Sequence, residues 1–152
     1  MISVQGKIST QKSGWLQLSN KIDCGLVLLT ALAKNGSRGP ISLRIVAERS
    51  GLSFYFLQKV AADLKRAGLI EAGRGTMGGY SLCKSPADIS IQDVLEAHEG
   101  PLALMRCLDA GHSCFREDFC TVRSGMHFIN QTIVSTLAGT TLADFINPQK
   151  KW

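Results

Sequence analysis

Three cysteines lie close together in the second half of the chain. They are Cys107, Cys114 and Cys120, with six and then five residues between successive members. Three thiolates on one flexible segment can converge on a single metal centre, and soft thiolates suit iron–sulfur clusters. The spacing differs from the short CxxC knuckles of structural zinc sites. Taken alone, the pattern leaves three alternatives open: metal ligation, redox chemistry at the thiols, or plain burial.

The remaining cysteines and histidines give weaker indications of chemistry. His112 lies inside the cysteine segment and could serve as a ligand. Cys24 and Cys83 are expected to be small core residues, and His98 and His127 fall on expected helices, where a satisfied or exposed imidazole is the usual case. The chain contains five cysteines, and an odd number in a chain expected in the cytoplasm argues against a disulfide framework.

A second group of residues, near position 55, could contact DNA. A recognition helix needs polar or aromatic side chains at its N-terminal, solvent-facing positions, because these reach base edges in the major groove. Gln58 could hydrogen-bond adenine, Lys59 could contact guanine or phosphate, and aromatic rings could contact a thymine methyl. The alternative is a solvated helix face without a ligand. The candidate residues are Ser53, Tyr55, Phe56, Gln58 and Lys59.

A glycine-rich loop at 73–79 follows this helix and contains Arg74 and Gly78. Two short strands are expected on either side of it, at 69–72 and 80–83, so the loop is interpreted as a wing. Glycines let the backbone approach a groove closely, and an arginine that enters a narrow minor groove is favoured electrostatically. The alternative is a plain hairpin. The loop does not match a phosphate-binding P-loop, because the Lys-Ser/Thr pair and a following helix are missing.

Apolar periodicity and capping residues predict the elements that position these groups. Ser19 is expected to cap the first helix, Gly51 to separate the second and third helices, and Ser53 to cap the third. Ser90 and Asp93 match a capping box. The expected helices span 19–34, 43–50, about 53–67, 90–99 and 121–138.

These elements predict a mainly α fold with a small β-wing: a winged helix-turn-helix plus a long C-terminal dimerisation helix. The expected domains are a flexible N-terminal arm (1–17), the DNA-binding domain (18–86), and the cluster-binding loop with the dimerisation helix (87–152). The net charge of +5 favours a polyanionic partner. No apolar run is long enough to span a bilayer and no secretory signal is recognised, so a cytoplasmic protein without a membrane partner is expected.

The sequence resembles the Rrf2 family of bacterial winged-helix regulators, in particular its IscR-like and NsrR-like members. The resemblance runs from residue 18 to about 147 and includes Asp23 in the first helix. Its most specific stretch is 74–82, although Thr76 and Met77 stand where a Pro-Gly pair is common. The other matching stretches are 41–53, 56–59, 64–70, 89–94, 96–100 and 140–145.

The resemblance implies a homodimer in which the helix at 121–138 crosses its partner. It also implies that Cys107, Cys114 and Cys120 bind a [2Fe–2S] or [4Fe–4S] cluster. Some members use a histidine three residues after the last cysteine, but Arg123 occupies that place here. Others use an acidic residue on the first helix of the partner subunit, and Asp23 matches that position. Asp23 is therefore the expected fourth ligand, with His112 as the alternative.

The hypothesis from sequence is a transcriptional repressor, not an enzyme, that binds a double-stranded DNA operator. Cluster loss or damage by nitric oxide, oxidants or iron shortage would change the spacing of the two reader helices and their fit to two half-sites. One alternative is a cluster-free winged-helix regulator that uses thiol chemistry or a protein partner. The other is a small iron–sulfur electron carrier with incidental basic charge.

Overall fold

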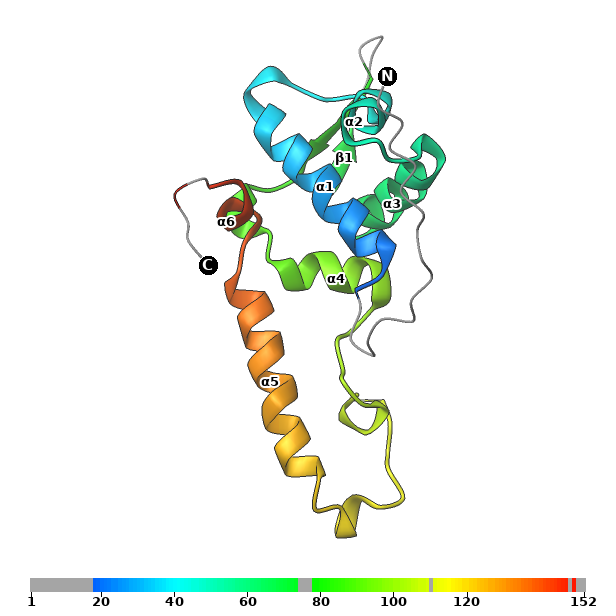
Figure 1. Ribbon diagram of the computed structural model, residues 1–152, viewed down its shortest axis with the longest axis vertical. Helices are drawn as coiled ribbons and strands as arrows, with labels where there is room; N and C mark the ends of the chain where they lie inside the picture. The colour runs from blue at the N-terminus through cyan, green and yellow to red at the C-terminus, as the bar shows by residue number, and fades with distance from the viewer. Residues whose placement is uncertain (1–17, 74–77, 110, 148, 150–152) are drawn as a thin grey trace, which may run out of the picture.

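The computed structural model describes residues 18–73, 78–109, 111–147 and 149 (Figure 1). Helices dominate, and the two strands form one small sheet, so the predicted mainly α fold with a β-hairpin is confirmed. No described helix is long and apolar enough to cross a membrane. The elements are α1 (Asn20–Asn35), η1 (Gly36–Arg38), α2 (Leu43–Ser50), α3 (Phe54–Arg66), β1 (Ile70–Ala72), β2 (Tyr80–Leu82), η2 (Pro86–Asp88), α4 (Ile91–Glu99), η3 (Arg106–Leu108), η4 (Glu117–Phe119), α5 (Arg123–Gly139) and α6 (Leu142–Ile146).

The first three helices pack around one apolar core. We call these helices, together with the sheet, α4 and α6, the body. Leu28 and Leu29 of α1 and Leu57 and Leu64 of α3 are 0% exposed. Gly51 ends α2 at a φ of 71°, a left-handed conformation that a residue with a Cβ rarely adopts. The chain can therefore turn at once into α3, which gives the predicted helix-turn-helix.

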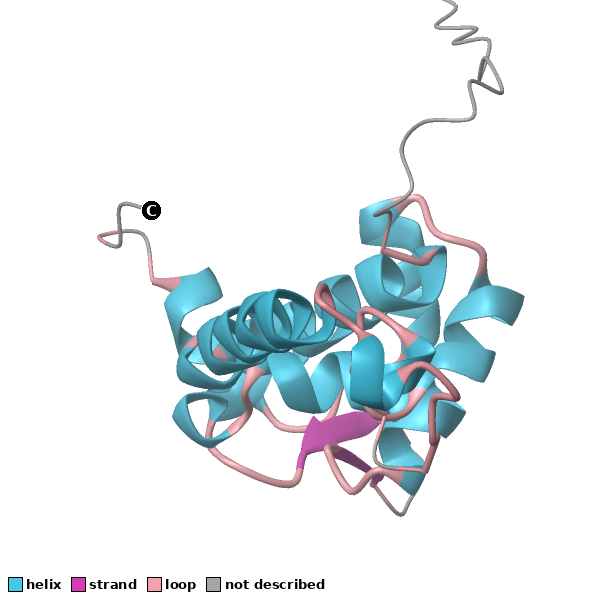
Figure 2. Cartoon of the chain, turned by 90° about the horizontal axis from the view of Figure 1, so that it is seen from below, coloured by secondary structure: helices cyan, strands magenta, loops and turns pink. Residues whose placement is uncertain are grey.

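The hairpin sheet is connected to the segment before α2 through Ile41, which pairs with Tyr80. Strands β1 and β2 pair antiparallel, with Ile70 opposite Leu82 and Ala72 opposite Tyr80. The Tyr80 amide donates to the Ile41 carbonyl (2.9 Å), and the Ile41 amide donates to the Tyr80 carbonyl (3.0 Å). Figure 2 shows the strand pair on one side of the molecule with helices packed over it. The wing therefore begins from a base that is fixed to Ile41, in the segment before α2.

The C-terminal end of the chain returns to the body. The Leu142 amide donates to the Ile89 carbonyl and the Ile91 amide donates to the Thr140 carbonyl, each at 2.8 Å. Leu142 is 0% exposed and belongs to the main core. The predicted capping box of Ser90 is present at the start of α4. The body thus contains residues from both ends of the described chain.

Between α4 and α6 the chain leaves the body as an extension. We call this extension the arm (residues 101–109 and 111–139); it is distinct from the N-terminal arm expected at 1–17. Figure 1 shows the cysteine segment running away from the body and α5 running back toward it. None of the residues Arg123–Gly139 is buried. The Leu104 amide donates to Asn130 Oδ1 at 2.9 Å, which ties the two sides of the arm together.

Two expectations about individual residues are wrong. Ser19 does not cap α1 through its side chain; its hydroxyl donates instead to Glu99 Oε1 at 2.6 Å, 80 residues away in sequence. Cys83 is exposed rather than buried, because it follows the end of β2. Cys24 is 4% exposed and is a core residue as predicted. Both residues are placed by the tertiary structure, which the local sequence does not determine.

Candidate nucleic-acid interface and cysteine segment

Helix α3 presents a polar and aromatic face to solvent at its N-terminal end. Ser53 caps the helix by accepting a hydrogen bond from the Phe56 amide at 3.4 Å. Tyr55 is 74% exposed, and Gln58 and Lys59 are also exposed. Phe56 is half buried and packs against the core. Because Leu57 on the opposite face is fully buried, the face of α3 that carries the exposed residues is directed toward solvent.

The start of α3 and the base of the wing share one concavity. A cavity of about 250 Å³ is lined by Phe54 and Gln58 from α3 and by Gly73, Gly78 and Tyr80 from the wing base. Gly78 is exposed there. The predicted wing arginine, Arg74, lies outside the described residues. Of the predicted helix residues, Gln58 lines this concavity together with Gly78, whereas Ser53, Tyr55, Phe56 and Lys59 do not line it.

Gly79 has a role that the sequence reasoning missed. A Cβ built at this residue would lie 2.7 Å from the carbonyl carbon of Ile41, closer than side-chain carbons approach a backbone. The Gly73 amide donates to the Gly79 carbonyl at 2.8 Å, which closes the hairpin next to this contact. Gly79 is therefore needed for close approach of two backbone segments and not only for flexibility. A glycine within a hairpin was the only sequence signal for it.

Arg44 is a second residue that the sequence reasoning missed. Its guanidinium lies 5.2 Å from the centre of the Phe54 ring, a cation–π distance. The Ser42 hydroxyl caps α2 by accepting from the Arg44 amide at 3.2 Å. Arg44 is exposed and stands beside the first residue of α3. A positive charge at this place suits a DNA phosphate, and its position in the first turn of α2 was the available signal.

A charged cluster joins α1, α3 and α4 on another side of α3. The Asp63 carboxylate is 3.5 Å from Lys21 Nζ, 3.2 Å from Arg66 Nη1 and 3.5 Å from His98 Nδ1. Burial alone would raise the pKa of Asp63, but the hydrogen bond with His98 and the charges of Lys21 and Arg66 outweigh it, so the pKa lies below its ordinary value. These contacts fix the position of α3 against its neighbours.

The imidazole of His98 has no solvent exposure. Burial lowers its pKa, and the contact with Asp63 opposes this change only in part. Its Nε2 atom has no hydrogen-bond partner among the described residues and would lie 2.6 Å from a Cβ built at Gly25. The imidazole is therefore a neutral packing group between α4 and α1.

The three loop cysteines are free, half-buried thiols spread along the arm. Cys107 is in η3, Cys114 precedes η4, and Cys120 follows η4. A cavity of about 480 Å³ is lined by Cys107, His112 and Arg123, among others. His112 Nδ1 lies 3.3 Å from Asp109 Oδ2. Within the described residues, no three His, Cys, Asp or Glu side chains are gathered as a ligand set.

Arg123 connects the cysteine segment to the first turn of α5. Its guanidinium forms an ion pair with Glu117. The hydrogen bond with Glu117 raises the pKa of Arg123, and the charges of Glu117, Cys107 and Cys114 add to the rise. Cysteine sulfur is the usual protein ligand of iron–sulfur clusters. The donor types therefore suit an iron–sulfur centre, although the thiols are not arranged around one point.

Asp23 lies on a different part of the molecule from the cysteines. It is an exposed residue in the first turn of α1, on the body, whereas the three thiols are on the arm. The structure therefore does not bring Asp23 and the cysteines of one chain together as a ligand set. An exposed carboxylate at this place is accessible to a second chain.

Comparison with known families gives one match over most of the chain. The family model described as "Rrf2, iron-dependent transcriptional regulator" matches residues 18–148. The HTH-type transcriptional regulator CymR of Bacillus subtilis (strain 168) is 31% identical over 127 residues, which cover 83% of this chain and 92% of CymR.

Solved structures match the fold to a similar extent. The structure of IscR from T. potens has a TM-score of 0.69 and 32% identity, and the match covers 87% of each chain. The oxidised form of Staphylococcus aureus CymR has a TM-score of 0.68 and 28% identity, covering 90% of this chain and 100% of that one. The structure is thus similar to winged-helix regulators over both the body and the arm.

Proposed function

The chain belongs to the Rrf2 family of transcriptional regulators, and from this premise we propose that it binds an operator as a homodimer through α3 and the wing, under the control of an iron–sulfur cluster on the arm. The relatives are named as transcriptional regulators, which gives no support to the alternative of an electron carrier.

One observation chiefly supports the DNA-binding part of this proposal. Gln58 of α3 and Gly78 of the wing base line a single concavity, so the start of α3 and the wing base face the same space. Tyr55 and Lys59 are exposed on the same helix, and Arg44 adds positive charge beside it. We propose that Ser53, Tyr55, Phe56, Gln58 and Lys59 meet the major groove, and that Arg74 and Gly78 meet the adjacent minor groove.

The proposed dimer is supported by the exposed apolar side chains of the arm. Phe128 is 69% exposed and Ile129 is 45% exposed, both on α5. A long helix with apolar side chains in solvent is unfavourable, and contact with a second copy of α5 would remove them from water. Two copies of α3 would then be held at a fixed separation, which matches paired half-sites on DNA.

For the sensor, we propose that Cys107, Cys114 and Cys120 hold the cluster and that Asp23 of the partner subunit supplies the fourth ligand. The support is the donor type, the half-buried thiols and the iron-dependent description of the family. When bound, the cluster would supply redox and ligand-exchange chemistry. The residues of this chain would hold it against the partner's α1 and so connect the arm to the reader helices.

A second candidate is thiol sensing without a cluster. It is favoured by the separation of the three thiols in the structure and by the existence of a relative crystallised in an oxidised form. In this case reversible oxidation of the half-buried cysteines would alter the arm. The two candidates share the same DNA-binding body and differ only in what the cysteines hold.

The DNA-binding proposal is tested by selecting genomic fragments with the purified protein and measuring affinity for the selected fragment. We expect Lys59→Ala and Gln58→Ala each to weaken binding about tenfold, since a base contact contributes ~1–3 kcal/mol. Lys84→Ala removes one exposed positive charge outside α3 and serves as the matched control. Equal effects of Lys59→Ala and Lys84→Ala would show that only general charge is being measured.

A further inference from the structure

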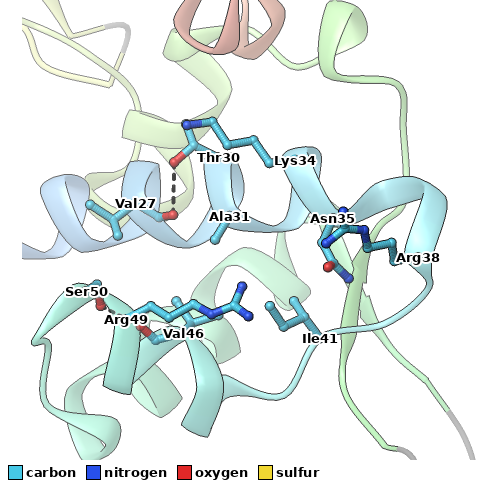
Figure 3. Close-up of a pocket in the computed structure, with 10 residues that line it drawn as sticks. All are labelled: Val27, Thr30, Ala31, Lys34, Asn35, Arg38, Ile41, Val46, Arg49 and Ser50. Atoms are coloured by element: carbon cyan, nitrogen blue, oxygen red, sulfur yellow. Dashed lines mark hydrogen bonds between the residues drawn. The ribbon is translucent and has the colours of Figure 1, made fainter.

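A pocket of about 370 Å³ lies between α1 and α2, the first helix of the helix-turn-helix (Figure 3). We call it the α1–α2 pocket. Part of its lining is apolar: Val27 and Ala31 from α1, Val46 from α2, and Ile41 from the segment before α2. Ala31 points from α1 toward α2 in Figure 3. This pocket belongs neither to the concavity between α3 and the wing nor to the cysteine segment.

The rest of the lining carries a strong excess of positive charge. Lys34, Arg38 and Arg49 line the pocket, and its ten described lining residues include no carboxylate. None of these three cations forms an ion pair with any residue that the structure describes. Three like charges around one pocket repel one another, so an anion bound among them would remove an unfavourable interaction.

The cations come from three successive elements. Lys34 is in the last turn of α1, Arg38 ends η1, and Arg49 is in the last turn of α2. Asn35 Nδ2 donates to the Gly39 carbonyl at 2.7 Å, which fixes the turn that contains Arg38. In Figure 3 the Arg49 side chain extends from α2 along the pocket toward Ile41.

We propose that the α1–α2 pocket binds a small organic anion, with its phosphate or carboxylate group at Lys34, Arg38 and Arg49 and its apolar part against Ala31 and Val46. Guanidinium groups bind both kinds of oxyanion in a bidentate manner. The volume of about 370 Å³ lies in the range of small-molecule sites and leaves room for an apolar body beside the charged group. An occupant would contact both α1 and α2 and so stabilise their packing.

A phosphate of the DNA backbone is the other source of the same chemistry. The apolar lining favours a small molecule, because a DNA phosphate presents only polar oxygens and sugar to a protein surface. The pocket's binding of a small anion does not depend on operator binding, so it is measured on the full chain without DNA. The two sources are separated by adding DNA in a second measurement.

The test is a methyl NMR titration of the full chain with phenyl phosphate, compared with phenol and inorganic phosphate. We expect saturable shifts at the methyl groups of Ala31, Ile41 and Val46 with phenyl phosphate, weaker binding of inorganic phosphate and no binding of phenol. In Arg38→Gln/Arg49→Gln the dissociation constant should rise at least tenfold.

Lys84→Gln is the matched control, because it removes one exposed positive charge outside the pocket and outside the proposed DNA-contacting residues, and it should leave the dissociation constant unchanged. The single variant Arg49→Gln covers the case in which the double variant does not fold. Absence of saturable shifts in the wild type, or equal binding by the double variant and the wild type, would overturn the proposal. A second result would also overturn the proposal: phenyl phosphate does not bind, and the double variant reduces the salt dependence of operator binding. The pocket would then belong to the DNA interface.

Discussion

The body and the arm differ in how they bury apolar side chains. In the body, Leu57 and Leu64 are 0% exposed and belong to one continuous core. In the arm, Phe115 is 92% exposed, Phe119 is 86% exposed, and none of the residues Arg123–Gly139 is buried. The difference indicates that the body is stabilised by its own packing, whereas the arm exposes apolar side chains that we propose a second copy of the chain covers. The residues that we propose contact DNA are on the body, and the three loop cysteines are on the arm.

The largest effect is expected from a core residue of the body. Leu64→Ala should lower the free energy of unfolding by ~2–5 kcal/mol, because it leaves a cavity under the reader helix. Phe119→Ala removes more side-chain atoms from the arm but should change the free energy of unfolding by less than ~0.5 kcal/mol, since the ring is in solvent. Urea unfolding of both variants measures the difference. Equal destabilisation would contradict the proposed division into body and arm.

The base of the wing should be the next most sensitive place. Gly79→Ala should cost ~1–3 kcal/mol of stability, because the added Cβ meets the Ile41 backbone at 2.7 Å. Gly36→Ala is the control, since a Cβ there meets nothing within 4 Å. Thermal unfolding compares the two variants with the wild type. A neutral Gly79→Ala would mean that the wing base is not held closely against Ile41.

A substitution in the arm should change the dimer dissociation constant rather than the free energy of unfolding. Phe128→Ala should raise the dimer dissociation constant about tenfold, equal to ~1.4 kcal/mol, because an exposed ring on α5 would lose its contact with the partner. Tyr55→Ala also removes an exposed aromatic ring, but from the body, and should leave association unchanged. Sedimentation velocity over a concentration series measures both. If both variants dissociate alike, or neither does, α5 is not the dimer interface.

The smallest effect concerns His98 of α4, which packs against Gly25 of α1 and contacts Asp63 of α3. Burial lowers the pKa of His98, whereas a histidine in the unfolded chain titrates near ~6.5. As the pH falls below about 6.5 the unfolded state binds the proton first, so the free energy of unfolding decreases. Asp63 stays ionised over this range, because its pKa lies below the ordinary value.

We therefore expect the wild type to lose more stability than His98→Gln between about pH 7.5 and about pH 5.5. Urea unfolding at each pH gives the two slopes, and the exposed histidines His112 and His127 are common to both proteins. Parallel curves would mean that His98 binds its proton equally well in the folded and the unfolded state.

The body could be predicted from sequence because its signals are local. The observed bounds of α2 are the predicted ones, 43–50, because Gly51 directly follows the helix and an apolar pattern comes before Gly51. The caps Ser53 and Ser90 were likewise predicted and confirmed. A cap or a turn glycine acts within a few residues, so its pattern can be recognised without knowledge of the tertiary structure.

Contacts between distant parts of the chain could not be predicted in this way. The bond from Ser19 to Glu99 and the approach of Gly79 to Ile41 join residues that no short pattern relates. For the cysteines, residue type and spacing indicated the donor chemistry, but their arrangement depends on the arm. Because the arm lacks buried residues of its own, local sequence contains little information about its geometry.

The most direct test of the central claim, that cysteines on the arm control DNA binding by the body through a cluster, combines two assays on anaerobically purified protein. Iron and sulfide content with the visible spectrum, and affinity for the selected operator, are measured for the wild type and for Cys114→Ala. The account predicts a coloured wild type with stoichiometric iron and sulfide, and loss of both the cluster and the cluster-dependent affinity in the variant. An iron-free wild type that binds the operator as tightly as Cys114→Ala would contradict it.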